Sequence, residues 1–381
     1  MNNQKKTAIL FPFVGDSVGG SHWSIIELIN EFKKSNLECY FAIHETGPLS
    51  NFFDAKSISY IILKKKTLAG ERPTIFNFLL GFMHNFWQIR KIVKNYDIDI
   101  IHGNDLRINL TWSIASFFLK TKYIWHQRSL ISNPGKWLFL KFLTNHIIAI
   151  SDYVGRSIPK NVSPKNYSII NNPFSVKKIF DKRISKESIC KNFNVSHNDF
   201  LVGYVGRLIE WKKVDELLLD FSNFYKNNPE ENIRLLILGS GPEDYISKLH
   251  RTIKDNYLND LVIFCGFSNE PSNFISGLDC LVAPSQSEPF GRTLIESMIQ
   301  NTPVLAYAAA GHLEIVKDSV NGFLYSKSYE NSFEETLKII IRNPIKVNEV
   351  ITKAHSFATK NYSEKKHFEL LVKVYLKCLR N

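Results

Sequence analysis

The sequence predicts an α/β protein built from two Rossmann-like halves, each a parallel sheet covered by helices. Short apolar runs alternate with longer amphipathic runs through both halves of the chain, which is typical of βαβ units. A polar stretch at residues 181–199 interrupts the alternation once, and then it starts again. The chain has 381 residues, more than one ordinary hydrophobic core holds, and this favours two domains.

The expected elements follow from where the apolar runs fall. In the first half, strands are expected at residues 7–13, 38–43, 58–63, 98–102, 123–126 and 146–150. Amphipathic stretches such as residues 21–34 and 106–119 predict helices between them. In the second half, strands are expected at residues 201–206, 234–238, 261–265, 280–283 and 303–307, with a helix at 214–225. Residues 333–379 have a helical pattern throughout.

Composition and charge indicate a globular protein with a basic first half. Hydrophobic residues make up 44% and charged residues 22% of the chain, and the formal net charge is +12. Residues 1–172 carry 21 Lys and Arg against 11 Asp and Glu, whereas residues 173–381 carry 27 against 25. The surplus favours an anionic partner such as acidic lipid, a phosphorylated acceptor or nucleic acid. A solvated basic surface without a partner is the alternative explanation.

Cysteine usage and the first residues lead us to expect a cytoplasmic protein. The five cysteines are scattered and form no CxxC motif, which favours neither a disulfide framework nor a zinc site. Residues 1–6 are polar and lack the apolar core of a signal peptide, so export is not expected. No apolar run reaches the roughly 18 residues that span a bilayer.

One aromatic segment could lie at a membrane surface. Residues 74–94 are rich in Phe and Leu, follow Lys64-Lys65-Lys66 and end in Arg90, Lys91 and Lys94. An amphipathic helix with basic flanks can lie in a membrane interface. More often such a stripe packs on its own sheet, and we favour that interpretation for this helix. Peripheral attachment of the protein at the inner face of a membrane is a separate expectation.

Distinctive residues follow the expected strands, where ligands of parallel sheets bind. In the first half these are residues 15–20, Gly103-Asn104-Asp105 and His126-Gln127-Arg128. In the second half they are Gly206-Arg207, Gly239-Ser240-Gly241-Pro242, Gly266-Phe267 and residues 285–291. If the two halves face each other, one cleft collects all of them.

The stretch from Glu288 to Glu296 is the most informative of these. It follows the apolar run at 280–283, and a Phe-Gly turn opens what is expected to be a helix. Helix N-terminal amides in this layout point at a bound phosphate. Glu288 would lie in the loop and Glu296 within the helix, so the two carboxylates could contact different parts of an extended ligand such as a sugar nucleotide.

Two cations close in sequence suit a diphosphate. Arg207 stands just after an apolar strand, and Lys212 lies five residues further on, at the mouth of a helix. The alternative, two surface charges, explains their position at a strand end less well.

The remaining motifs are weaker. Gly19-Gly20, Gly239 to Pro242 and Gly266-Phe267 are each explained by turn chemistry as well as by ligand binding. His126 is a candidate at the cleft rim, with a structural histidine as the alternative. Asp105 could equally be a helix cap. The eleven histidines show no HxH or HxxxH spacing, so no metal site is expected.

In their order along the chain these pieces resemble the retaining GT-B glycosyltransferases of glycosyltransferase family 4. The matching pieces in the first half are Val18-Gly19-Gly20, Asp99-Ile100-Ile101-His102, Ala149-Ile150-Ser151 and Ile170-Asn171-Asn172. Those in the second half are Val205-Gly206-Arg207-Leu208, Leu236 to Pro242, Phe264-Cys265-Gly266-Phe267, Val282-Ala283-Pro284-Ser285, the Glu288/Glu296 pair and Ala310 to Ile315.

The resemblance implies three segments and a set of roles. Residues 1–172 would bind the acceptor, residues 173–360 would bind the donor, and residues 361–381 would pack back on the N-terminal domain. The residues implied in catalysis are Glu288, Arg207, Lys212 and His126. Those implied in donor binding are Gly19, Gly20, Gly206, Gly266, Phe267, Phe290, Gly291, Arg292, Thr293 and Glu296. Those on the acceptor side are Asn104, Asp105 and Arg128.

In more detail, the resemblance implies that Arg207 and Lys212 hold the donor diphosphate. Glu288 would contact the sugar hydroxyls, Glu296 the ribose, and His126 the region of the transferred sugar. The leaving phosphate would take the acceptor proton, so no dedicated protein base is needed. Fixed cations and helix amides would replace a divalent ion, so no metal cofactor is expected.

Four positions depart from the family pattern. They are Lys213, Asn172-Pro173, Pro289 and His312, which stand where glycine is frequent, with Asn172-Pro173 in place of Asn-Gly. They bear on donor choice and loop geometry more than on the activity.

The implied function is transfer of a hexose-type sugar from a nucleotide diphosphate sugar to a glycan or polyprenyl-diphosphate-linked acceptor. The expected setting is bacterial surface polysaccharide synthesis, either lipopolysaccharide O-antigen or capsule. Alternatives are a sugar-nucleotide epimerase on the same fold, a basic nucleic-acid-binding protein and a non-catalytic partner protein. We expect no nucleic-acid partner, because no recognition-helix or zinc signature is present.

Overall fold

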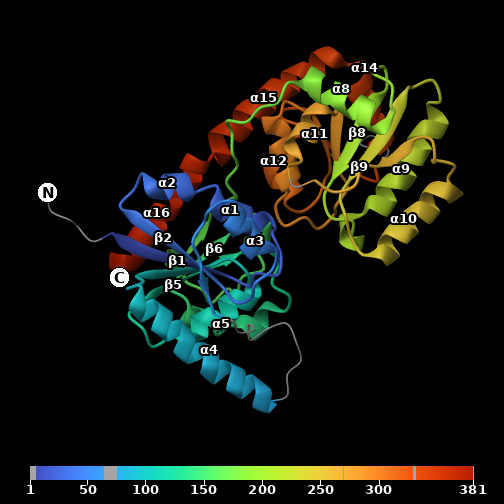
Figure 1. Ribbon diagram of the computed structural model, residues 1–381. Coiled ribbons are helices and arrows are strands. Elements are labelled where there is room, and N and C mark those ends of the chain that lie inside the picture. The colour runs from blue at the N-terminus through green and yellow to red at the C-terminus, as the bar shows by residue number, and fades with distance from the viewer. Residues whose placement is uncertain (1–5, 64–74, 269, 329–331, 381) are drawn as a thin grey trace. The chain divides into compact units, whose positions relative to one another are not determined.

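The computed structural model describes residues 6–63, 75–268, 270–328 and 332–380. It confirms the predicted α/β class, with two parallel sheets of seven and six strands that are covered by helices (Figure 1). The chain divides into two compact units. Unit 1 comprises Met1–Pro173 and Glu364–Asn381, and unit 2 comprises Phe174–Ser363.

Unit 1 is built on a seven-stranded sheet in the order β3-β2-β1-β4-β5-β6-β7. Its strands are β1 (Thr7–Phe13), β2 (Leu37–Ile43), β3 (Ile61–Ile62), β4 (Ile100–Gly103), β5 (Lys122–Gln127), β6 (His146–Ala149) and β7 (Tyr167–Ile169). In the central register Ile9 of β1 pairs with Cys39 of β2 and with Ile100 of β4. The apolar run of β1 is buried from its second residue onward, because helices cover both faces of the strand.

Helices lie on both faces of this sheet, with α2 and α16 on one and α4 and α5 on the other (Figure 1). The helices of unit 1 are α1 (Gly20–Ile26), α2 (Ile29–Lys33), α3 (Pro48–Ala55), α4 (Ile75–Asn95), α5 (Leu106–Ser116), α6 (Leu140–Leu143), α7 (Asp152–Gly155) and α16 (Glu364–Arg380). Two short 3₁₀ helices are η1 (Pro134–Trp137) and η2 (Pro164–Asn166). The helix expected at 21–34 is two short helices, separated at Glu27 and Leu28, which keep nearly helical backbone angles.

Unit 2 is built on a six-stranded sheet in the order β10-β9-β8-β11-β12-β13. Its strands are β8 (Phe200–Val205), β9 (Ile233–Leu238), β10 (Val262–Phe264), β11 (Cys280–Ala283), β12 (Val304–Tyr307) and β13 (Phe323–Tyr325). β13 and the edge strand β7 of unit 1 were not expected from the sequence. Neither lies in an apolar run longer than three residues, which is too short for a pattern to be recognised, whereas the equally short β10 lies in the five-residue apolar run 261–265.

Helices of unit 2 form one layer on each face of its sheet. They are α8 (Lys182–Phe193), α9 (Val214–Asn227), α10 (Glu243–Asp255), α11 (Ser272–Gly277), α12 (Arg292–Ile299), α13 (His312–Ile315), α14 (Phe333–Arg342) and α15 (Pro344–Tyr362), with a 3₁₀ turn η3 (Glu210–Lys212). α9, α10 and α14 contribute to the main core. In α9, buried Val214, Leu217, Leu218 and Phe221 recur at helical spacing, which explains why this segment is a helix on the sheet.

The C-terminal segment that was expected to be helical throughout forms three separate helices, because two residues interrupt the helical pattern. Pro344 begins α15, and Ser363 is extended and bridges to Phe174. The Phe174 amide donates to the Tyr362 carbonyl at 2.9 Å, so the two chain crossings between the units run side by side. Beyond Ser363, α16 packs Leu371 and Tyr375 into the core of unit 1.

Within the described ranges, no helix combines the length and apolar character that a bilayer crossing requires. The segment considered for a membrane interface lies in α4. Its lysines at 64–66 and most of its aromatic stripe (76–82) lie outside the described side chains. Of the rest, Met83 and Trp87 are exposed and Ile89 is buried.

Candidate functional site

In unit 2 the expected donor residues gather where the strand order of the sheet reverses. From β8 the chain continues to β9 on one side, whereas β11 lies on the other side of β8. Ligands of open parallel sheets bind beyond the carboxyl ends of the strands at such a point. Arg207 and Lys212 follow β8, and Glu288, Phe290 and Gly291 follow β11.

The structure brings Lys212 and Glu288 together. The Lys212 Nζ lies 2.5 Å from Oε2 of Glu288, and the two side chains are only 20% and 14% exposed. The ammonium group also lies 4.5 Å from the ring centroid of Trp211. A lysine ammonium has three N–H donors, so the pair with Glu288 leaves it donor capacity for a ligand oxygen.

The Arg207 side chain is exposed, and a hydrogen bond from a buried tyrosine fixes its backbone. The Tyr204 hydroxyl donates to the Arg207 carbonyl at 2.8 Å. Burial, and then the charge of Glu288, raises the pKa of Tyr204, so this hydroxyl stays protonated and keeps donating. Among the described residues, no side chain forms an ion pair or hydrogen bond with the Arg207 guanidinium.

The loop between Glu288 and Glu296 is fixed by aromatic packing. Phe290 is 2% exposed and stacks on Phe174, with ring centroids 6.3 Å apart. The Arg292 guanidinium lies 4.4 Å above the Phe174 ring, and its Nη2 is 3.4 Å from Oε1 of Glu296. Because its side chain is buried, Phe290 can offer only its backbone to a ligand.

Gly291 marks the turn into α12. Its φ of +106° lies in a region that side chains rarely adopt, so glycine suits the position. Thr293 follows in the first turn of α12 and is partly exposed.

Gly311 and His312 pack directly behind Glu288. The Gly311 amide donates to the Glu288 carbonyl at 2.9 Å. A Cβ at Gly311 would lie 2.8 Å from that same oxygen and 2.9 Å from the amide nitrogen of Phe290, so only glycine fits there. Burial lowers the pKa of His312 despite the opposing charge of Glu288, so His312 is neutral at physiological pH.

Backbone hydrogen bonds join the glycine turns that follow β8, β9 and β10. The Gly206 amide donates to the Leu238 carbonyl, and the Gly239 amide donates to the Gly266 carbonyl at 2.7 Å. A Cβ at Gly239 would lie 1.9 Å from the Gly206 carbonyl oxygen, which explains the glycine by close packing. Gly266 instead faces open space, and Phe267 beside it is 67% exposed.

In unit 1 the expected residues also lie where the strand order reverses, here between β1 and β4. Gly19 caps α1 after β1, and its amide donates to Nδ1 of His22 at 2.9 Å. Gly20 is the first residue of that helix. After β4, Asp105 is the N-cap of α5 and accepts from the Arg107 amide at 2.9 Å. Asp105 is therefore a helix cap, the structural alternative that the sequence left open for it.

Hydrogen bonds of the Arg128 side chain connect three strand ends of unit 1. Its Nη2 donates to the Asn104 side-chain oxygen at 2.7 Å, and its Nη1 donates to that of Asn172. The Ser24 hydroxyl also donates to the Asn172 oxygen at 3.2 Å, and it contacts the Gly20 carbonyl. Both asparagine side chains are neutral, so these hydrogen bonds orient the guanidinium without cancelling its positive charge.

Beside Arg128, three buried histidines lie close together. The Nδ1 of His126 is 3.2 Å from Nε2 of His102, whose Nδ1 is 2.7 Å from the Tyr375 hydroxyl of α16. The His126 and His367 rings are nearly parallel, with centroids 6.5 Å apart. Burial, followed by the charge of Arg128, lowers the pKa of His126 and of His102. Burial lowers the pKa of His367 to about 3, so all three rings are neutral at physiological pH.

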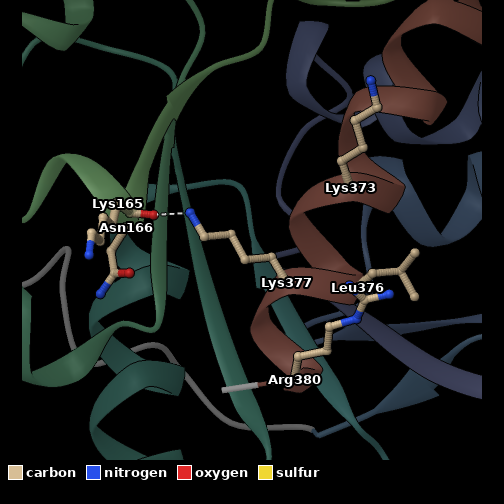
Figure 2. A pocket seen from close by; sticks show the side chains of 6 residues that line it. All are labelled: Lys165, Asn166, Lys373, Leu376, Lys377 and Arg380. Atoms are coloured by element: carbon tan, nitrogen blue, oxygen red, sulfur yellow. Dashed lines mark hydrogen bonds between the residues drawn. The ribbon is translucent and has the colours of Figure 1, made fainter.

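A basic pocket of about 550 Å³ lies elsewhere in unit 1, at the amino end of β7 (Figure 2). It is lined by Lys165, Asn166, Lys373, Leu376, Lys377 and Arg380. The Lys377 ammonium donates to the Lys165 carbonyl. None of its four basic side chains forms an ion pair with a residue that the structure describes. The sequence singled out none of these residues, and three of the four basic ones lie outside residues 1–172, whose charge surplus pointed to an anionic partner.

The structure thus groups the predicted residues within each unit, and the single shared cleft stays a prediction. Sequence reasoning missed Tyr375 and His367, because a long helix of charged and apolar residues gives no local sign of a polar contact in the core. Gly311 could have been found, since it stands in the piece Ala310 to Ile315 that carried the resemblance.

Two units with parallel sheets and ligand-type residues at both reversal points define the GT-B class of fold. Residues 185–357 match the family model of glycosyl transferases group 1, and residues 18–178 match that of glycosyltransferase family 4. The chain therefore belongs to the GT-B glycosyltransferases of family 4.

Individual relatives agree with this family. The chain is similar to a glycogen synthase of Thermodesulfovibrio yellowstonii, at 27% identity over 55% of this chain and 42% of that protein. It is also similar to the capsular polysaccharide biosynthesis glycosyltransferase CapM of Staphylococcus aureus, at 25% identity over 53% of each. The matched region thus spans about half or less of these curated relatives. These matches favour a glycosyltransferase over the epimerase and the nucleic-acid-binding protein.

A solved structure matches nearly the whole chain. The Anabaena protein Alr3699/HepE, in complex with UDP and glucose, superposes with a TM-score of 0.82 at 19% identity. The superposition covers 97% of this chain and 100% of the other. It supports the two-unit fold.

Proposed function

We propose that this protein is a retaining glycosyltransferase that moves a hexose-type sugar from a nucleotide diphosphate sugar to a glycan or lipid-linked glycan. The observation that carries the proposal is the Lys212–Glu288 pair where strand order reverses between β8 and β11, with the exposed Arg207 in the same loop, five residues before Lys212. Family membership supports it, as does the binding of UDP and glucose by the Anabaena protein that shares the fold.

In this proposal the donor lies along the loops of unit 2. Arg207 and Lys212 bind the diphosphate, assisted by the backbone amides of Phe290 and Gly291. Glu288 accepts hydrogen bonds from the sugar hydroxyls and, through its ion pair, holds the Lys212 ammonium in place. Glu296 accepts from the ribose, Gly266 and Phe267 border the base, and Gly20 of unit 1 contacts phosphate.

The reaction breaks the bond between the anomeric carbon and the diphosphate oxygen and forms one to an acceptor hydroxyl oxygen. The acceptor proton passes to the leaving phosphate, so the protein need not supply a base. The main contribution of the chain is stabilisation of the departing negative charge by fixed cations and amides. These cations would take the place of a metal ion, and the metal-free mechanism is part of the proposal.

The acceptor side of the proposal rests on unit 1. Asn104, Asp105 and Arg128 lie at strand ends there, and Arg128 brings a positive charge that is oriented by Asn104. We place the activity in surface polysaccharide synthesis, either lipopolysaccharide O-antigen or capsule, a proposal that the name of CapM supports. The anionic partner proposed for the basic surface is a membrane or a phosphorylated acceptor.

A donor screen tests this proposal. UDP-, GDP-, ADP- and dTDP-sugars are compared by thermal shift, since a bound donor raises the unfolding temperature by mass action. The stabilising donor is then incubated with the protein and candidate acceptors, and the product anomer is determined by NMR. An inverted anomer would refute retention, and conversion of the donor without any acceptor would favour an epimerase.

A further inference from the structure

The basic pocket of unit 1 is formed by two segments that lie far apart in the sequence. One wall is η2, which carries Lys165 and Asn166, and the other is the C-terminal part of α16. The basic residues of α16 stand at positions 373, 377 and 380, spacings that place them on one face of the helix. In Figure 2 the Lys377 side chain reaches from this face to the Lys165 carbonyl, 212 residues away in sequence. The fold thus gathers four positive charges around one hollow of about 550 Å³.

The positive charges of this pocket lack an acidic partner among the residues that the structure describes. None of the four side chains forms an ion pair with them, not even Lys373 with Glu369, which stands one turn earlier on α16. Lysines four residues apart on a helix repel each other, so the arrangement lowers the stability of α16. Burial, and then the charge of Lys377, lowers the pKa of His146 on the neighbouring strand β6 to about 4. An anion between η2 and α16 would offset this unbalanced charge.

The dipole of α16 explains only part of the arrangement. Lys377 and Arg380 lie in the last turn of the helix, where cations are stabilising. Lys373 stands before that turn, where the effect of the dipole has fallen off, and Lys165 belongs to another segment. Neither of these two lysine side chains forms a hydrogen bond with a described residue. Binding of an anion accounts for both of them.

The groups that line the pocket suit a phosphate ester. Ammonium groups bind phosphate oxygens as point charges, and a guanidinium binds them through two parallel hydrogen bonds. Lys377 uses one of its three N–H donors on the Lys165 carbonyl and keeps two for a ligand. The volume of about 550 Å³ lies in the range of small-molecule sites. Leu376, which is 45% exposed, adds an apolar surface for the organic part of the ester.

The pocket lies at the opposite edge of the sheet from the residues implied in sugar transfer. Lys165 and Asn166 immediately precede the first residue of β7, so they lie at the amino end of that strand. Gly19, Asn104 and Arg128 follow strands of the same parallel sheet and lie at its carboxyl edge. The length of the strands therefore separates a ligand in the pocket from these residues.

We propose that the pocket between η2 and α16 is a second anion site, which binds a phosphate ester and takes no part in the transfer reaction. The headgroup of an anionic lipid and a soluble phosphate ester share this chemistry. The site goes beyond the proposed function, since its ligand is held by the basic side chains of unit 1 and needs neither donor nor acceptor.

Calorimetric titration of the whole chain with glycerol 3-phosphate at low salt tests the site with a soluble ester. Lys165→Gln with Lys373→Gln removes one charge from each wall and breaks no described hydrogen bond or ion pair. This double variant should bind about 10-fold more weakly, as loss of charge-assisted hydrogen bonds predicts, with an unchanged unfolding temperature. Lys353→Gln with Lys360→Gln, exposed lysines of α15, is the matched control and should bind like the wild type. Arg207→Ala, in the loop assigned to the donor, should also bind like the wild type.

Vesicles of phosphatidylcholine with phosphatidic acid present the same phosphate ester in a bilayer. Sedimentation with these vesicles that the Lys165/Lys373 double variant loses would assign the site to a lipid headgroup. Loss of glycerol 3-phosphate binding alone, without sedimentation of the wild type, would assign it to a soluble ester.

Three results would overturn the proposal. They are binding of neither probe by the wild type, equal binding by the wild type and the Lys165/Lys373 double variant, and binding that only Arg207→Ala abolishes. Sugar transfer to a soluble acceptor gives a further readout, because the double variant should keep the kcat of the wild type. A lower kcat at an unchanged unfolding temperature would show that the pocket belongs to the transfer reaction.

Discussion

Nζ of Lys212 lies 2.5 Å from Oε2 of Glu288, and the pair joins the loops after β8 and β11 across 76 residues of sequence. Both side chains are mostly buried, so removal of one partner would leave an uncompensated charge in a poorly solvated place. The pair therefore holds the lysine in a fixed position before a ligand arrives, and such preorganisation is what stabilises a developing charge.

We expect Lys212→Ala to lower kcat by about 100- to 1,000-fold, the usual cost of losing one preorganised group that faces a developing charge. Lys338→Ala is the matched control, because Lys338 forms an ion pair of similar burial with Glu334 at 2.8 Å within α14. The kcat of both variants is measured with the stabilising donor. Equal losses of kcat in the two variants would contradict the assignment of Lys212 to the diphosphate.

Arg207→Ala should weaken donor binding without destabilising the fold, because no described side chain pairs with its guanidinium. The expected result is a smaller donor-induced thermal shift with an unchanged unfolding temperature in the absence of donor. Arg251→Ala, an exposed arginine of α10, should change neither quantity. An Arg207 variant that binds donor like the wild type would contradict the prediction.

Gly311→Ala should disturb the loop that carries Glu288. The new methyl group would lie within 3 Å of backbone atoms of Glu288 and Phe290, and backbone cannot move aside cheaply. Overpacking of this kind costs about 1–3 kcal/mol of stability. We expect a lower unfolding temperature and a raised KM for the donor. Gly135→Ala, where a Cβ meets nothing within 4 Å, should leave both unchanged.

Stability should fall as the pH drops below about 6.5, the ordinary pKa of histidine. Burial lowers the pKa of His22 to about 4, of His146 to about 4 and of His367 to about 3. Between 6.5 and these values the unfolded chain binds protons that the folded chain does not, and each histidine adds up to about 1.4 kcal/mol per pH unit to the slope. Asp220, whose pKa burial raises to about 6, acts in the opposite direction.

Urea denaturation at pH 7.5, 6 and 5 checks this prediction. His146→Gln removes one of the buried histidines whose pKa is lowered and should flatten the slope relative to the wild type. Equal free energies of unfolding at pH 7.5 and 5 would show that these histidines are not buried as described.

The basic pocket should contribute to binding of anionic membranes. Lys373→Glu with Lys377→Glu reverses two of its four charges, and each lysine near an anionic surface adds about 1 kcal/mol of binding. We expect reduced sedimentation with phosphatidylserine vesicles at low salt. Lys353→Glu with Lys360→Glu, the same charge change on exposed positions of α15, is the control. Equal binding by both double variants would place the membrane contact elsewhere.

The sequence allowed most of the strands to be predicted, because buried parallel strands are continuous apolar runs. β1 was predicted with its observed bounds, whereas β7 and β13, whose apolar runs are at most three residues long, carry too little pattern to be recognised. The candidate residues at strand ends were found for a related reason: a polar residue or glycine directly after an apolar run lies at the carboxyl edge of a sheet.

By itself, the sequence determined the α/β class, the family and the strand-end positions of Arg207, Lys212, Glu288 and His126. These depend on local order along the chain, which periodicity and spacing record. Only the tertiary structure decided that Lys212 pairs with Glu288 and that Tyr375 reaches His102. The reason is physical: each contact joins residues far apart in sequence, and its energy comes from burial and charge that exist only once the sheets have formed.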